Sequence, residues 1–188
     1  MEQVKKEKNE LWEWSKALLI AFGLAAIIRF FLFTPIVVDG DSMMPTLKNG
    51  DRMVVNKIGY MVGEPDRFDI VVFHAPEQKN YIKRVIGLPG DHVAYKNDQL
   101  YINGKEVAEP YLEQYKSEIT EGTLTDDFTL EEIPGVEVDK IPEGYVFVMG
   151  DNRRYSKDSR HIGLVAIDEI IGDTNVVFWP LNEIGLVK

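Results

Sequence analysis

The chain has 188 residues, no cysteine and a formal net charge of -10 at pH 7. Its length suits one ordinary domain with an appendage. The absence of cysteine excludes a disulfide framework, a thiol nucleophile and a cysteine-based metal site, and the acidic balance argues against a nucleic-acid partner.

The first predicted element is an apolar segment at residues 17–38, which only Arg29, Thr34 and Pro35 interrupt. It predicts a single membrane-spanning helix, and no small-x-small cleavage site follows it, so we expect it to persist. Arg29 weakens this interpretation, because the run before it spans about 18 Å of helix against a hydrocarbon core of about 30 Å. A helix that continues through Phe33 just reaches the lower limit. A buried core helix is the alternative.

The residues beside this segment predict its orientation. Residues 1–16 carry four lysines, which favour a cytoplasmic N-terminus, and Trp12 and Trp14 suit the membrane interface. We therefore expect a cytoplasmic segment at 1–16, a single-pass anchor in the cell membrane at 17–38 and an extracytoplasmic domain at 39–188.

A short turn centred on Ser42 follows, within the run from Val38 to Leu47. Gly40 can adopt backbone angles closed to other residues, and Pro45 restricts its own φ and the residue before it, so Ser42 should lie on a stiffened bend. A catalytic serine needs such a turn and a nearby proton acceptor. An isolated S-x-x-P is usually only a loop, so this assignment depends on two later segments.

Beyond residue 47, short β-branched and aromatic runs separated by Gly, Pro and Asx residues predict strands. The expected strands are 52–57, 69–73, 81–86, 92–96, 99–102, 145–149 and 170–179. Asn103 and Gly104 form a strong two-residue hairpin signal. The pattern predicts a mainly β fold, in which an antiparallel β-sheet domain follows the N-terminal transmembrane helix.

An acidic segment at residues 106–143 contains twelve Asp or Glu residues against two Lys. We interpret it as a smaller lobe inserted in the β domain, solvated and kept away from anionic headgroups by like charge. A solvated acidic face with no part in the chemistry is the simpler interpretation.

The second informative segment is residues 81–91, where Lys83 lies in an apolar strand-like run. Strand alternation puts Lys83 and Arg84 on opposite faces, so we expect one cation inside and the other in solvent. A free lysine has a pKa of about 10.4, but burial can lower it until a neutral amine serves as general base beside a serine. A surface lysine on an edge strand is the alternative.

The third segment, residues 150–160, is dense in polar side chains directly after an apolar strand. Asp158 and Arg160 are spaced to pair with each other. Ser156 is able to orient a lysine amine through a hydrogen bond. These features indicate a loop that supports a nearby reactive group.

The three histidines, His74, His92 and His161, are scattered without metal-ligand spacing. We expect neither a metal nor a cofactor. A Ser-His-Asp triad built on Asp91 and His92 is rejected, because adjacent residues of an extended strand point to opposite faces.

The motifs SMMPT at 42–46, YIKRVIGLPGD at 81–91 and GDNRRYSKDSR at 150–160 stand in this order behind the apolar segment. Together they resemble the type I signal peptidases of Gram-positive bacteria over nearly the whole chain. The resemblance implies a membrane-anchored serine endopeptidase that cleaves signal peptides from secretory preproteins at the outer face of the cytoplasmic membrane. The implied partners are those preproteins, the membrane lipids and the secretion translocon.

By motif position, the resemblance makes Ser42 the nucleophile and Lys83 the general base of a Ser/Lys dyad. It implies that Ser156 positions the Lys83 amine, and that Asp158 and Arg160 form an ion pair that stabilises the loop.

The chain departs from the family pattern at two positions. Gly40 stands where some members have a serine that helps to bind the oxyanion, so the Ser42 N–H must do this, with water or the Gly40 backbone as second donor. Phe68 stands where the family often has glycine, which bears on the geometry of a turn.

We expect an extended substrate segment to add as a strand beside Val38 and Ile82. Small substrate side chains would then enter shallow apolar pockets near four residues, which are Val38, Met43, Leu47 and Tyr81.

Two other kinds of protein remain as alternatives. Self-cleaving repressors also resemble the Ser/Lys pattern, but they need a DNA-binding region and an internal scissile bond, commonly Ala-Gly, and this chain has no Ala-Gly. A membrane-tethered β module that binds exported proteins without catalysis should tolerate Ser42→Ala, whereas a protease should not.

Overall fold

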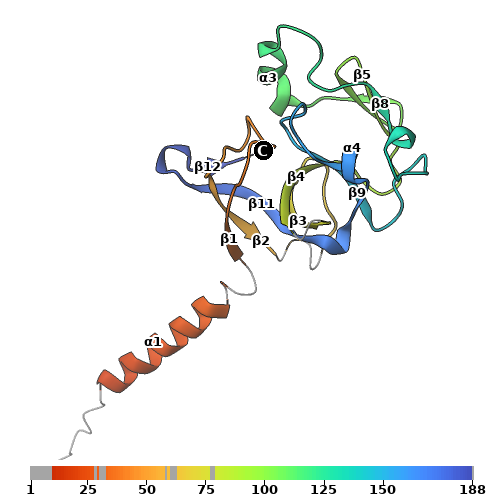
Figure 1. Ribbon diagram of the computed structural model, residues 1–188. Helices are drawn as coiled ribbons and strands as arrows, with labels where there is room; N and C mark the ends of the chain where they lie inside the picture. The colour runs from red at the N-terminus through yellow and green to blue at the C-terminus, as the bar shows by residue number, and fades with distance from the viewer. Residues whose placement is uncertain are drawn as a thin grey trace, which may run out of the picture.

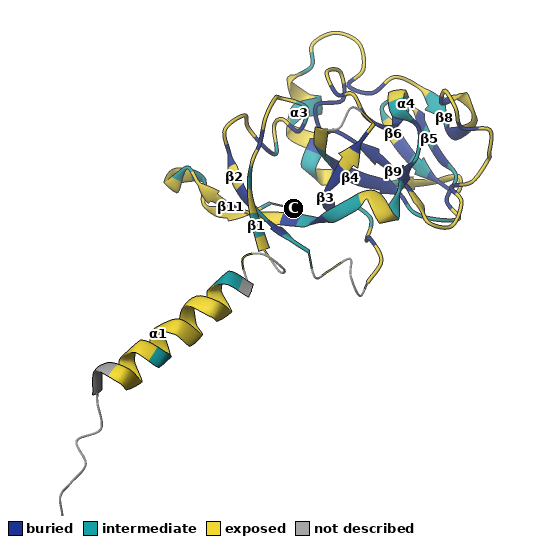
Figure 2. Cartoon of the chain, turned by 60° about the horizontal axis from the view of Figure 1, so that its bottom comes forward, coloured by how far each residue is buried: buried dark blue, intermediate teal, exposed yellow. Residues whose placement is uncertain are grey.

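The computed structural model describes residues 10–27, 29, 33–57, 59, 63–76 and 79–187. They form an N-terminal helix, α1 (Glu10–Ile27), and two antiparallel sheets (Figure 1). The helix lies apart from the sheets, and its apolar side chains, such as Leu19 and Phe22, are exposed (Figure 2). Within the described ranges, no helix combines the length and hydropathy that a membrane span requires.

The predicted extent of the N-terminal helix is wrong at its far end. Residues Phe33–Val37 form strand β1, which pairs antiparallel with β2 (Arg52–Asn56). The exposure of β1 alternates from residue to residue, which is the period of a strand. Residues 28 and 30–32 lie outside the described part of the chain. The apolar segment 17–38 is therefore divided between a helix and a strand of the β domain.

The larger sheet has the strand order β1-β2-β11-β3-β4-β9-β10, with β12 paired to β11. Its further strands are β3 (Ile70–Ala75), β4 (Lys79–Gly87), β9 (Tyr145–Met149), β10 (Val165–Ala166), β11 (Ile170–Trp179) and β12 (Gly185–Leu186). The first half of β4 pairs with β3, whereas its pairing with β9 begins only at Arg84. Among the described strands, none pairs with the other edge of this half of β4, which lies beside the Ser42 turn.

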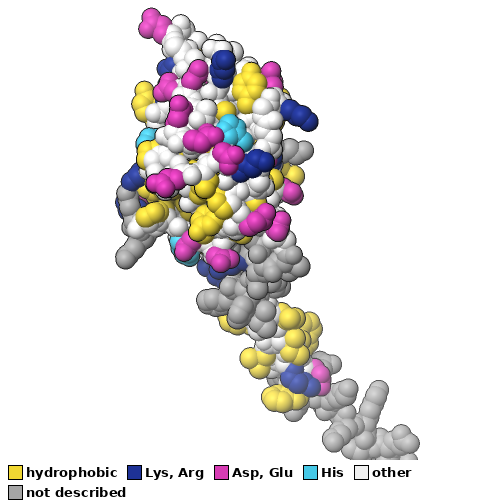
Figure 3. All heavy atoms as spheres, turned by 90° about the vertical axis from the view of Figure 1, so that its right-hand side faces the viewer, with side chains coloured by type: hydrophobic (Ala, Val, Ile, Leu, Met, Phe, Trp, Pro, Cys, Tyr) yellow, Lys and Arg dark blue, Asp and Glu magenta, His cyan; other side chains and the backbone are white. Residues whose placement is uncertain are grey.

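The smaller sheet has the order β7-β6-β5-β8. Its strands are β5 (Val93–Lys96), β6 (Gln99–Ile102), β7 (Lys105–Val107) and β8 (Phe128–Thr129). The predicted hairpin between β6 and β7 is confirmed, since Asn103 and Gly104 have φ of 52° and 74°. The acidic segment 106–143 supplies only β7 and β8 of this sheet, and acidic side chains are spread over this side of the molecule (Figure 3).

Short helices connect these strands. They are η2 (Pro110–Leu112), α3 (Glu113–Glu118), η3 (Leu130–Glu132), α4 (Ser159–Ile162), η4 (Ile167–Glu169) and η5 (Leu181–Glu183). Every strand expected from the sequence is present within two residues of its predicted bounds, so the mainly β antiparallel fold is confirmed.

An apolar cluster lies beneath the Ser42 turn. Its buried members are Val38, Met43, Leu47, Met53, Ile70 and Val177, which come from the turn, β2, the start of β3 and β11. Burying one such side chain contributes about 1.5–3 kcal/mol. Because Val38 and Met43 are buried on either side of Ser42, they fix the backbone that presents it.

Candidate active site

The turn before Ser42 has the predicted constrained geometry. Gly40 has φ of +92°, which is a region that L side chains rarely adopt. The N–H of Gly40 donates to Asn49 Oδ1 at 3.0 Å, and the N–H of Met44 donates to the Asp41 carbonyl at 3.1 Å. These bonds and the buried Met43 leave Ser42 partly exposed on a fixed bend.

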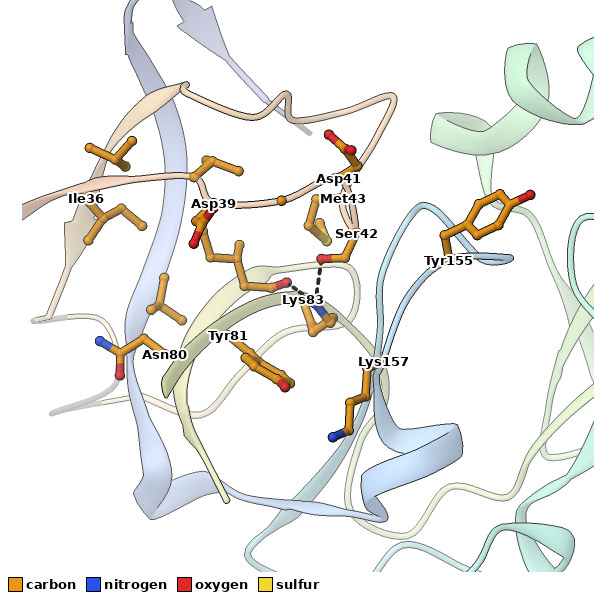
Figure 4. A pocket seen from close by; sticks show the side chains of 15 residues that line it. Ile36, Asp39, Asp41, Ser42, Met43, Asn80, Tyr81, Lys83, Tyr155 and Lys157 are labelled. Carbon is orange, nitrogen blue, oxygen red and sulfur yellow. Dashed lines mark hydrogen bonds between the residues drawn. The ribbon is translucent and has the colours of Figure 1, made fainter. Parts of the chain in front are cut away.

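Lys83 and Ser42 come together although 41 residues separate them. The Lys83 Nζ donates to Ser42 Oγ at 2.7 Å and to the Ile82 carbonyl at 2.9 Å (Figure 4). The Lys83 side chain is 3% exposed, and its Nζ lies 5.1 Å from the centre of the Tyr81 ring. The two motifs therefore meet at one pair of atoms.

Burial lowers the pKa of the Lys83 amine from 10.5 to about 8. The charged form loses hydration in the protein interior, and this outweighs the attraction of the Asp158 and Asp151 carboxylates, which raise the pKa. The amine is thus mostly neutral above pH 8, where a free lysine is still charged.

Arg84 is not in solvent, and the expectation that one of the two cations would be exposed is wrong. The Arg84 guanidinium donates to both Asp151 carboxylate oxygens, at 2.9 and 2.7 Å, and both side chains are fully buried. It also donates to the Phe68 carbonyl at 2.9 Å and lies 3.9 Å from the centre of the Tyr111 ring. Strand alternation does not predict this burial, because the carboxylate that pairs with Arg84 comes from Asp151, 67 positions later in the chain.

The expected ion pair between Asp158 and Arg160 is present. Arg160 Nε and Nη2 donate to the two Asp158 oxygens, each at 2.8 Å, and the Gly150 N–H donates to one of them at 3.0 Å. Burial alone would raise the pKa of Asp158, but Arg160 and the Gly150 N–H lower it below its usual value. A buried, ionised Asp158 thereby links the end of β9 to the start of α4.

Ser156 does not make the expected hydrogen bond to Lys83. Its Oγ is buried beside Asp158, where it helps to lower the pKa of that carboxyl, but it makes no hydrogen bond to Lys83 among the described residues. Gly150 packs so closely here that a Cβ atom at this position would collide with Ser156 Oγ and with the Ser42 carbonyl oxygen. A side chain at position 150 is therefore excluded by the close approach of two site residues.

The structure shows what the two departures from the family pattern, at Gly40 and Phe68, do to the backbone. The N–H of Gly40 is already bonded to Asn49, so it is not available as the second oxyanion donor. Phe68 has φ of 76°, a left-handed conformation that favours glycine and costs other residues about 1–2 kcal/mol. Its ring packs edge to face with Tyr111 at 5.5 Å, which offsets part of this strain.

An open groove of about 530 Å³ adjoins the pair of side chains. Of the predicted substrate-binding residues, Val38, Met43, Tyr81 and Ile82 line it together with Ser42 and Lys83. Leu47 is a correction, because it is fully buried in the cluster beneath the turn and does not line the groove. Further residues that the motifs did not indicate also line the groove, and they are Ile36, Val37, Asp39, Asp41, Val72, Asn80, Tyr155 and Lys157. Ile36 and Val37 could have been found from the apolar run that leads into Val38.

A serine hydroxyl bonded to a buried lysine amine, beside an open groove in a β domain, fits the class of serine peptidases in which lysine is the base. The chain belongs to the signal peptidase family, peptidase S26, whose family description matches residues 11–179.

Individual relatives agree with this assignment. A signal peptidase I of Bacillus caldolyticus is 49% identical over 183 residues, which is 97% of each chain. A signal peptidase IB of Staphylococcus aureus is 45% identical over 179 residues, which is 94% of this chain and 93% of that one.

The crystal structure of a signal peptidase I from Enterococcus faecalis has a similar fold. The two structures agree with a TM-score of 0.57 at 42% sequence identity. The match covers 97% of that chain and 60% of this one. The antiparallel β fold is therefore that of a signal peptidase I.

Proposed function

We propose that this chain is a membrane-anchored serine endopeptidase that removes signal peptides from secretory preproteins, with Ser42 as nucleophile and Lys83 as general base. The observation that supports it best is the 2.7 Å contact between Lys83 Nζ and Ser42 Oγ, made by an amine whose pKa is lowered to about 8. The names of the relatives support the substrate class.

The chemistry follows from these two groups. Neutral Lys83 accepts the Ser42 proton as Oγ attacks the carbonyl carbon of the scissile peptide bond. The N–H of Ser42 binds the oxyanion, and Lys83 then gives its proton to the leaving amine, so that the C–N bond breaks. Water, deprotonated by the same amine, hydrolyses the acyl-enzyme and restores the Ser42 hydroxyl.

The substrate is proposed to bind as an extended strand between two open strand edges. β1 is the terminal strand of the larger sheet, and the first half of β4 pairs with β3 only. Ile36 of β1 and Val38 just after it line the groove together with Tyr81 and Ile82 of β4, and Figure 4 shows Ile36 and Tyr81 on its walls. A peptide strand can hydrogen-bond to such edges while its small side chains enter apolar pockets.

Three features of α1 support the proposed anchor. Its apolar side chains are exposed, with Phe22 at 80% and Leu19 at 73%, Trp12 and Trp14 lie near its start, and lysines precede it. An anchor that shares one membrane with the substrate would raise the effective concentration of the cleavage region. We further propose that the domain lies outside the cytoplasm, with the lipids and the secretion translocon as neighbours.

Replacing Ser42 by alanine is expected to abolish cleavage, because it removes the hydroxyl that Lys83 would activate to form the acyl-enzyme. The full chain is incubated with a purified preprotein, and the new N-terminus of the product is sequenced. The unmodified chain should yield one product with a single new N-terminus, formed by cleavage directly after small residues of the preprotein. Cleavage by Ser42→Ala at the same bond would refute the proposed function and favour a binding module contaminated by another protease.

A further inference from the structure

Three successive residues of the loop after β9 each contact the acidic segment of the smaller lobe, within residues 109–125. Arg154 Nη2 donates to the Glu121 and Thr123 carbonyls, each at 2.7 Å. Arg153 bonds to Glu109, and Asn152 accepts a bond from Tyr115. The acidic segment is therefore more than a solvated face, because it contacts the loop that also supports Ser42 and Lys83.

The contact through Arg153 is buried. Arg153 is 2% exposed and Glu109 is 6% exposed, and Arg153 Nη2 lies 2.5 Å from Glu109 Oε1. The Tyr95 and Tyr111 hydroxyls donate to the same carboxylate oxygen, each at 2.7 Å. Arg153 Nε also donates to the Gly150 carbonyl at 3.1 Å. The ion pair between Arg153 and Glu109, with its additional hydrogen bonds, therefore holds the backbone of the loop after β9 against the lobe.

The contact through Asn152 reaches the Ser42 turn directly. Its backbone N–H donates to the Ser42 carbonyl at 3.1 Å, and its side-chain Nδ2 donates to the Asp41 carbonyl at 2.9 Å. The opposite end of the same side chain, Oδ1, accepts from the Tyr115 hydroxyl on α3 at 3.3 Å. The buried side-chain amide of Asn152 thus connects Tyr115 of the lobe to Asp41, and its backbone N–H holds Ser42 itself (Figure 4 shows the turn at Asp41 and Ser42).

We propose that residues 109–125 are a positioning element for the Ser42 turn, acting through Asn152 and Arg153. The inference rests on the proposed function, because its effect is on the chemistry of Ser42. Asn152 donates to both carbonyls of the turn, so without its side chain the hydroxyl loses one of the restraints that hold it 2.7 Å from Lys83. A displacement of about 1 Å in a reacting group can cost about 100-fold in rate.

The test distinguishes an effect of Asn152 on the position of Ser42 from an effect on substrate binding or on the stability of the fold. Asn152→Ala keeps the backbone N–H and loses both side-chain bonds, so kcat should fall about 10- to 100-fold while KM stays within about 2-fold. The rate at which a small activated ester acylates Ser42 should fall by the same factor, because the ester does not fill the groove. The midpoint of thermal unfolding, measured in parallel, reports any general loss of structure.

Two further variants keep the inference falsifiable. Tyr115→Phe removes one hydroxyl and should lower kcat about 2- to 5-fold, in the range of one lost hydrogen bond. Arg154→Ala is the matched control, since Arg154 contacts the same lobe segment but not the turn, and its kcat should be unchanged.

Unchanged kcat in both Asn152→Ala and Tyr115→Phe would overturn the inference. So would an equal loss in Arg154→Ala, since that would indicate general loosening of the loop. The proposed function fails on a separate result, which is a Ser42→Ala chain that still cleaves.

Discussion

Lys83→Met is expected to be inactive and more stable than the unmodified chain. Lys83 Nζ is the side-chain group that bonds to Ser42 Oγ in the described part of the chain, so without this amine cleavage should fall by about 10⁴-fold or more. At pH 7 the unmodified lysine is charged while buried, and lowering its pKa from 10.5 to about 8 corresponds to about 3 kcal/mol. Methionine has a similar shape and avoids this cost, so after the loss of two hydrogen bonds the free energy of unfolding should rise by about 1–3 kcal/mol.

The gain in stability should depend on pH in a defined direction. Because the folded pKa of Lys83 is lowered, the unfolded chain binds more protons between about pH 8 and 10.5, and the stability of the unmodified chain rises there. The advantage of Lys83→Met is therefore complete below pH 8 and lost above 10.5. Denaturant unfolding at pH 7 and pH 10.5 measures it, with the exposed Lys105→Met as control. If Lys83→Met is less stable than the unmodified chain at pH 7, burial of the charged Lys83 amine does not destabilise the fold as predicted.

Asp151→Asn is expected to be the most destabilising single change near the site. It leaves the Arg84 guanidinium charged and uncompensated in a fully buried position, which costs about 3–5 kcal/mol. The loss of the Asp151 charge also removes one of the two influences that raise the pKa of Lys83, so the residual activity should appear at lower pH.

A double substitution provides the control for this prediction. Arg84→Met combined with Asp151→Leu removes both charges and should recover most of the lost stability, because apolar replacements for a buried pair are often neutral. Denaturant unfolding of the two variants and the unmodified chain gives the comparison. If the double variant is as unstable as Asp151→Asn, the defect comes from lost packing and not from an unpaired charge.

The sequence predicted the central strands because they depend on local signals, whereas the pairing of Ser42 with Lys83, 41 positions apart, was expected from the order of three motifs that resemble a known family. Apolar runs of strand length with turn residues between them define β2 to β6, and a lysine inside such a run marks burial. The hairpin at Asn103 and Gly104 was predictable for the same reason, since both residues tolerate positive φ.

The missed features depend on contacts between distant segments. Strand β1 continues the apolar run of the helix, so composition alone could not separate the two, and only its pairing with β2 does so. Arg84 is buried because Asp151, 67 residues later, meets it. Leu47 and Ser156 are both buried in places that the sequence motifs did not indicate.

The most direct test of the account is the pH dependence of kcat/KM for preprotein cleavage by the full chain. Because Lys83 must be neutral to accept the Ser42 proton, kcat/KM should rise with pH to a plateau, with a midpoint near 8. The same midpoint should persist in His92→Ala, since His92 pairs with Glu131 and does not line the groove. A midpoint near 6.5 that disappears in His92→Ala, or a midpoint near 10.5, would contradict a buried lysine amine as the base.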